Sequence, residues 1–195
     1  MNDIETKRYL KSETKVVSLI ADYKEMLILD IGGGGEGIIG KVYGRNVIAI
    51  DRELEELEET NNKSIKIVMD ACEMKFSSNQ FDVTTSFFSL MYMNNKEKEK
   101  AIVEVNRVLK PGGVFEIWDT NVPMYKGKGQ DIYVLQLQIK LETEIINTGY
   151  GVLMDDKGQN VAGLKTLIMK SGFEIMEYYE YDSELYRIKC TKKNN

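Results

Sequence analysis

Short apolar runs that end in an aspartate recur along the first two thirds of the chain. The run 26–31 contains Asp30, and the runs 46–51, 65–70 and 114–119 end in Asp51, Asp70 and Asp119, while a further run covers 81–87. Stretches with helical spacing separate them, at 36–43, 52–60 and 96–109. Strands buried on both faces have continuous apolar sequences, so this alternation predicts an α/β, Rossmann-like doubly wound fold. We expect a mostly parallel sheet with helices on both of its faces.

The two ends of the chain follow other patterns. Apolar positions between Asp3 and Tyr23 predict an N-terminal amphipathic helix within residues 1–25. Residues 131–156 alternate with period two and predict an extra β-hairpin, and 159–170 has a helical pattern. The last two predicted strands, antiparallel and bringing the sheet to seven, lie at 173–181 and 185–191. No linker is visible, so we predict a single domain over residues 1–195, with its core at 26–120 and its C-terminal helix and strands at 157–195.

Composition excludes several kinds of chemistry. The chain has 26 lysines and arginines against 31 acidic residues, a net charge of −5, which disfavours nucleic acid as a partner. It contains no histidine, so imidazole bases, serine or cysteine triads with histidine and the common zinc sites are excluded, and we expect no metal. The two cysteines, the charged N-terminus and the lack of a long apolar run predict a cytoplasmic protein without a membrane partner.

A glycine-rich segment carries the strongest functional signal. Six glycines lie within the nine positions 32–40, directly after a predicted strand and at the start of a helix. Glycine permits the tight turn and the close backbone approach that a bound nucleotide requires. Asp51 follows about 20 residues later, where an acidic side chain can accept hydrogen bonds from a ribose, and Asp70 ends the next strand at the same edge. A nucleotide-containing ligand is therefore expected at this edge, although each aspartate could instead be a strand-end or helix-capping residue.

At these motifs the chain resembles the class I S-adenosylmethionine-dependent methyltransferases, in particular the ubiquinone-biosynthesis-like (type 11) group that acts on small molecules. The resemblance covers residues 26–120 well and the C-terminal part loosely. The most specific marker is Arg107-Val-Leu-Lys-Pro-Gly-Gly113 at the end of a predicted helix. The other segments that carry it are 27–34, 49–51, 68–71 and 81–83.

The resemblance implies S-adenosylmethionine as cofactor and assigns its contacts. The glycine segment would cradle the methionine part, the aspartates and their neighbours would hold ribose and adenine, and two phenylalanines would border the sulfonium. The family has a glycine where this chain has Glu36, which suggests a loop extended by one residue. The implied cofactor residues are Asp30, Gly32, Gly33, Gly34, Glu36, Gly37, Asp51, Arg52, Asp70, Ala71, Phe87 and Phe88.

Methyl transfer from a sulfonium is an in-line displacement with a neutral leaving group, so alignment matters more than a general base. If a base is used, Tyr92 and Asp119 are the catalytic candidates by position, but Tyr92 could be a packing aromatic and Asp119 a loop cap. A small-molecule acceptor would enter an apolar pocket, and the protein would be a monomer or homodimer. The predicted pocket residues are Phe88, Met91, Tyr92, Trp118 and Tyr125.

Two other functions fit parts of the pattern. A protein could bind the cofactor without catalysis or act as a partner subunit, since no base is obvious. A nicotinamide-dependent oxidoreductase shares the fold and the ribose aspartate, and Tyr92 and Lys96 match its Tyr-x-x-x-Lys pattern, which chance alone produces about once in this chain.

Overall fold

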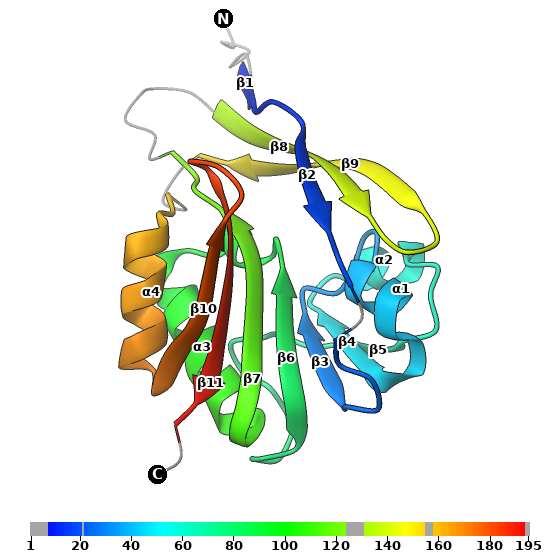
Figure 1. Ribbon diagram of the computed structural model, residues 1–195, viewed down its shortest axis with the longest axis vertical. Helices are drawn as coiled ribbons and strands as arrows, with labels where there is room; N and C mark the ends of the chain where they lie inside the picture. Colours follow the sequence, from blue (N-terminus) through cyan, green and yellow to red (C-terminus); the bar gives the residue numbers. More distant parts are fainter. Residues whose placement is uncertain (1–7, 21, 124–130, 155–157, 194–195) are drawn as a thin grey trace, which may run out of the picture.

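A seven-stranded sheet forms the centre of the protein (Figure 1). We describe the fold from a computed structural model, in which residues 8–20, 22–123, 131–154 and 158–193 are described. The strand order across the sheet is β10 (Phe173–Glu180), β11 (Leu185–Lys192), β7 (Leu109–Thr120), β6 (Phe81–Phe87), β3 (Ile28–Ile31), β4 (Val47–Asp51) and β5 (Ile65–Val68).

The five strands from β3 to β7 are parallel, and the two C-terminal strands are antiparallel. The chain starts in the middle of the sheet at β3, builds outward to β5 and then crosses to β6 on the other side of β3. The strand order therefore reverses between β3 and β6, and ligands of open α/β sheets bind at the carboxyl ends of the strands beside such a switch point. The predicted sheet is confirmed.

Helices cover both faces of this sheet. On one face α3 (Asn95–Val108) and α4 (Val161–Lys170) bury Ile102 and Ile168 against the sheet residue Phe115. On the other face the short α1 (Ile38–Tyr43) buries Ile39 against Ile28. The remaining helical segments are η1 (Gly44–Asn46), α2 (Leu54–Glu59) and η2 (Leu90–Tyr92). No helix in the described part of the chain is long and apolar enough to cross a membrane.

The prediction of an N-terminal helix is wrong for the residues that the structure describes. Strands β1 (Arg8–Lys11) and β2 (Lys15–Ser18) stand there, both parallel to β8 (Asp131–Lys140). Burial alternates along residues 16–20, with Val17 and Leu19 buried and their neighbours exposed, which is the period of a strand. Pairing with a strand more than 100 residues away decides the structure here, and local spacing cannot reveal it.

The predicted hairpin is present as β8 and β9 (Ile145–Leu153), paired from Ile132 to Leu153 and from Lys140 to Ile145. Together with β1 and β2 it makes a second sheet. Alternate β8 residues, Tyr133, Leu135, Leu137 and Ile139, are buried in the same core cluster as Phe88 and Trp118. Figure 1 shows this second sheet lying across the carboxyl-terminal ends of the parallel strands, so it forms a roof over the edge where a ligand is expected.

Candidate functional site

A cavity of about 720 Å³ lies at the carboxyl ends of the parallel strands. Its size suits a cofactor together with a small molecule, since ligand cavities span about 300–1,000 Å³. All of the residues that the sequence predicts for the cofactor line this cavity, and so does Tyr92. Residues Gly149, Tyr150 and Gly151 of the roof strand β9 also line it. The structure therefore brings the motifs of five chain segments to one place.

The glycine segment is built so closely that side chains would not fit. A Cβ on Gly32, whose φ is +68°, would lie 2.4 Å from the Cβ of Ser89, and a Cβ on Gly33 would lie 2.8 Å from that of Ala49. The amides of both glycines donate to the carbonyl of Ile50, at 2.8 and 3.0 Å. This turn leaves open backbone facing the cavity, the form of cradle that a nucleotide-containing ligand requires.

Asp30 is a buried carboxyl at the floor of the cavity. Its side chain is 2% exposed, and its Oδ1 accepts a hydrogen bond of 2.8 Å from the hydroxyl of Thr85. Burial raises its pKa from 3.8 to about 7, the nearby Asp51 adds to the rise, and the Thr85 hydrogen bond opposes it. The site therefore holds a carboxyl whose ionised form would gain from a cation.

The other two strand-end aspartates are oriented by backbone amides. The amide of Glu53 donates to Asp51 Oδ1 at 3.1 Å, and the amide of Cys72 donates to Asp70 Oδ1 at 2.7 Å. Ala71 is buried beside Asp70 on the cavity wall. Both aspartates therefore lie at the cavity, where the resemblance predicts contacts to ribose and adenine.

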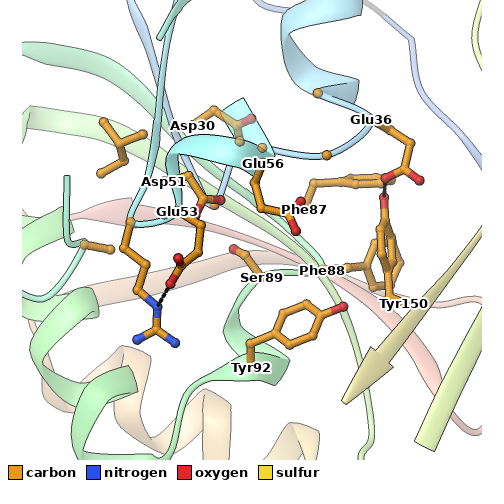
Figure 2. A pocket seen from close by; sticks show the side chains of 18 of the residues that line it. Asp30, Glu36, Asp51, Glu53, Glu56, Phe87, Phe88, Ser89, Tyr92 and Tyr150 are labelled. Carbon is orange, nitrogen blue, oxygen red and sulfur yellow. Dashed lines mark hydrogen bonds and ion pairs between the residues drawn. The ribbon is translucent and has the colours of Figure 1, made fainter. Parts of the chain in front are cut away.

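Glu36 connects the glycine segment to the roof. Its carboxylate accepts hydrogen bonds from the hydroxyl of Thr148 and from that of Tyr150, the latter at 2.9 Å (Figure 2). The Tyr150 ring packs on that of Phe88, with 5.8 Å between centroids. Tyr150 is a cavity residue that the sequence does not predict. The period-two pattern of β9 places it on the inward face with Thr148, but only the roof position shows that this face meets Glu36.

Tyr92 stands at the edge of the cavity in η2 and is 36% exposed. Burial raises the pKa of its phenol, and the negative charges of Asp119, Glu36 and Glu56 raise it further. A phenol that is harder to deprotonate is a poor general base near neutral pH. Tyr92 is therefore suited to donating a hydrogen bond or to packing against a ligand.

The structure does not bring Asp119 to the cavity. It is fully buried, its Oδ1 accepts from the amide of Thr120 at 2.8 Å, and it is absent from the described residues that line the cavity. Burial raises its pKa to about 7, while the Thr120 amide and the charge of Lys98 lower it. Asp119 is therefore an internal carboxyl of strand β7 behind η2, and neither the catalytic role nor the loop cap that the sequence allowed describes it.

The predicted acceptor pocket is also only partly assembled. Phe88 and Tyr92 line the cavity, whereas Met91 and Trp118 are buried in the core and are not among the described lining residues. Tyr125 lies outside the described residues. Glu36 and Tyr150 occupy the wall that the sequence assigned to apolar side chains.

Comparison with known proteins agrees with the geometry. Residues 29–117 match a family model described as a methyltransferase domain. The chain is 28% identical over 193 residues to a ubiquinone/menaquinone biosynthesis C-methyltransferase of Blochmanniella pennsylvanica, with 88% of this chain and 74% of that protein covered. It is 32% identical over 117 residues to a demethylmenaquinone methyltransferase of Staphylococcus carnosus, covering 58% and 45%, and 32% identical over 114 residues to phosphoethanolamine N-methyltransferase 1 of Triticum aestivum, covering 51% and 22%. The chain thus spans less than half of the last two relatives.

Solved structures share the fold at low identity. An S-adenosylmethionine-dependent methyltransferase of Methanosarcina mazei is 19% identical with a TM-score of 0.61, covering 90% of this chain and 96% of that one. The [4+2]-cyclase SpnF is 15% identical with a TM-score of 0.57, covering 88% and 76%. The fold, the cavity and the match over residues 29–117 are those of a class I S-adenosylmethionine-dependent methyltransferase domain. Within that class, the chain is similar to enzymes of the ubiquinone-biosynthesis-like type.

Proposed function

We propose that this chain transfers a methyl group from S-adenosylmethionine to a small-molecule acceptor that binds between the glycine segment and the roof strand β9. One observation carries the proposal: the cofactor residues expected from sequence all line a single cavity at the topological switch point of the sheet. When bound, the cofactor supplies an electrophilic methyl group on a sulfonium.

The residues divide the work of holding that cofactor. Asp51 accepts hydrogen bonds from the ribose hydroxyls, with Arg52 beside it. Asp70 accepts from the adenine amino group, and the Ala71 amide donates to the adenine ring. The fit rests on the cavity lining and on the glycine turn, where a Cβ on Gly34 would lie 2.6 Å from the Cβ of Glu56.

Near the reacting centre the chain mainly aligns and shields. Phe87 and Phe88 pack edge to face with 4.8 Å between ring centroids and present an apolar wall that excludes water. Tyr92 donates a hydrogen bond that orients the acceptor and takes no proton, because its pKa is raised. An in-line displacement with a neutral leaving group needs little more than this alignment.

The acceptor is a small molecule by analogy with the relatives, whose printed names include quinone and sterol C-methyltransferases and a phosphoethanolamine N-methyltransferase. We further propose a cytoplasmic location, which the two free cysteines support because reducing compartments keep thiols unpaired. A single domain, a monomer or homodimer, and the absence of nucleic-acid and membrane partners remain predictions.

Calorimetric titration with S-adenosylhomocysteine tests the site. Asp51→Ala and Asp70→Ala should each weaken binding about tenfold or more, since each removes a hydrogen bond between a charged group and the ligand. Glu55→Ala, an exposed carboxylate on α2, is the matched control and should bind like the wild type. Unchanged affinity in both aspartate variants would refute the assignment of the site.

A further inference from the structure

The cavity carries a large excess of negative charge. Among the described residues that line it, eight have carboxylates and one has a guanidinium, and that guanidinium, Arg52, lies 3.7 Å from the carboxylate of Glu53. The whole chain has a net charge of only −5, so the acidic groups are concentrated here. The carboxylates belong to Asp30, Glu36, Asp51, Glu53, Glu56, Glu59, Asp70 and Glu97.

The cofactor does not account for this excess. Its ammonium and sulfonium carry two positive charges and its carboxylate one negative charge, so a bound cofactor offsets one of the eight carboxylates. The proposed cofactor contacts use Asp51 and Asp70. The resemblance counts Glu36 among the cofactor residues, but its carboxylate is held by Thr148 and Tyr150 of the roof, and neither it nor Glu56 takes part in the contacts proposed above. Glu53, Glu59 and Glu97 also line the cavity.

Glu36 and Glu56 face the aromatic part of the cavity. Figure 2 shows their carboxylates on the side where Phe87, Phe88 and Tyr150 lie. Glu36 is fixed there by the hydroxyl of Tyr150. Aromatic faces attract cations, and an ammonium within about 6 Å of a ring centroid is stabilised by the ring quadrupole. Carboxylates beside such rings form a site suited to an ammonium with an apolar body.

The like charges repel one another in the protein alone. The pKa of Glu56 is raised by burial and then by the charges of Asp51, Glu59, Glu36 and Glu53. A cation placed among these groups relieves the repulsion, whereas an anion adds to it. The wall that would meet an acceptor thus discriminates between charges before any detailed contact is made.

We infer that the methyl acceptor is an organic amine, positively charged in water, whose ammonium is held by Glu36 and Glu56 against the rings of Phe88, Tyr92 and Tyr150. The ammonium gives one proton to one of these carboxylates, and the lone pair of the resulting neutral amine takes the methyl group as the neutral thioether leaves. Acceptors with a carboxylate or phosphate are rejected by the same wall. This inference rests on the proposed function, because it assigns the part of the cavity that the cofactor leaves open.

Calorimetry on the protein saturated with S-adenosylhomocysteine tests the inference with three probes of one shape. Phenethylamine, 2-phenylethanol and 3-phenylpropionate share a benzene ring and a short chain, and they end in an ammonium, a hydroxyl and a carboxylate. The same comparison is repeated with the amine, alcohol and carboxylate of an indole and of a cyclohexane. We expect each amine to bind at least about tenfold more tightly than its alcohol, more weakly at high salt, and each carboxylate to show no binding.

Variants identify the groups responsible. Glu36→Gln and Glu56→Gln keep the shape of the side chain and should each weaken amine binding roughly fivefold, with little change for the alcohols. Glu58→Gln lies on the same helix as Glu56, is exposed and is absent from the described cavity lining, so it should leave amine binding unchanged. Circular dichroism spectra matching the wild type establish that the variants are folded.

The outcomes distinguish failure of the proposed function from failure of the inference about the acceptor. Failure of S-adenosylhomocysteine to bind would overturn the proposed function itself. Binding of S-adenosylhomocysteine together with amines that bind no better than alcohols or carboxylates would overturn the inference alone. Equal amine affinity in the wild type and in both glutamate variants would also contradict it.

Discussion

Replacing Asp30 by asparagine should stabilise the protein while damaging its site. The wild-type carboxyl has its pKa raised from 3.8 to about 7, mainly by burial. Since the folded state holds this proton more tightly than the unfolded state, stability is lost as the pH rises from about 4 to about 7 and is constant above that. Asparagine does not titrate and still offers an amide oxygen to the hydroxyl of Thr85.

The magnitude follows from linkage. The change from 3.8 to about 7 corresponds to about 4 kcal/mol of unfavourable free energy at pH 8, at about 1.4 kcal/mol per pKa unit. At pH 5 the unfavourable free energy from Asp30 falls to about 2 kcal/mol, because the carboxyl is then protonated in the folded state and mostly ionised in the unfolded state. Asp30→Asn should therefore be more stable than the wild type by an amount that is about two and a half times as large at pH 8 as at pH 5.

Urea denaturation at the two pH values, followed by the fluorescence of the single tryptophan, Trp118, measures this difference. Asp82→Asn is the matched control: the Lys110 ammonium lowers the pKa of Asp82 below 3.8, so this variant should be destabilised by about the same amount at both pH values, which lie above the range in which Asp82 titrates. A stability difference for Asp30→Asn that is absent at pH 8, or that is equal at both pH values, would refute the burial argument. In the wild type we expect the affinity for S-adenosylmethionine to rise between pH 6 and 8, as the Asp30 carboxyl ionises. Asp30→Asn should lose this rise.

Three further predictions concern the cradle, the roof and the thiols. Gly32→Ala should abolish S-adenosylhomocysteine binding and destabilise the fold, because its Cβ would clash with Ser89. Gly44→Ala, also at positive φ but with open space around it, should cost only backbone strain of about 1–3 kcal/mol and leave binding intact. Equal loss of binding in calorimetry for the two variants would contradict the close packing at Gly32. Tyr150→Phe removes a hydrogen bond to a carboxylate and should lower the free energy of unfolding by about 2 kcal/mol, with faster hydrogen exchange confined to the roof sheet; unchanged exchange there would count against the link. Burial raises the pKa of Cys72 to about 11 and that of Cys190 to about 12, so both thiols should react slowly with an alkylating reagent at pH 8, the half-buried Cys72 faster than Cys190. Mass spectrometry should show that S-adenosylhomocysteine protects Cys72 alone. Protection of neither thiol would place the ligand elsewhere.

The central sheet and the cofactor wall could be predicted because their signals are local. A strand buried on both faces has a continuous apolar sequence, and the aspartates at or near the ends of β3, β4 and β5 mark the carboxyl edge within the same few residues. The glycines within 32–37 predict a turn that excludes side chains, and the structure places Gly32 at a positive φ against Ser89. These features need no knowledge of distant segments.

The features that the sequence did not predict depend on contacts between residues far apart in the chain. Residues 8–18 form strands because β8 offers them an edge, and their spacing alone suggested a helix. Asp119 ends its apolar run in the sequence as Asp51 does, but in the structure it lies inside β7, fully buried near Met91 of η2 and Lys98 of α3, so its place in the pattern gave the wrong surroundings. Tyr150 reaches Glu36 over 114 positions, and that contact defines the wall where the acceptor is expected.

Calorimetric titration of the purified chain with S-adenosylmethionine, S-adenosylhomocysteine and, as the control, NAD tests the central claim most directly. The account predicts micromolar binding of the first two ligands and none of NAD. Binding of NAD alone would instead indicate an oxidoreductase. No binding of any of the three ligands would contradict the claim that this cavity holds a methyl donor.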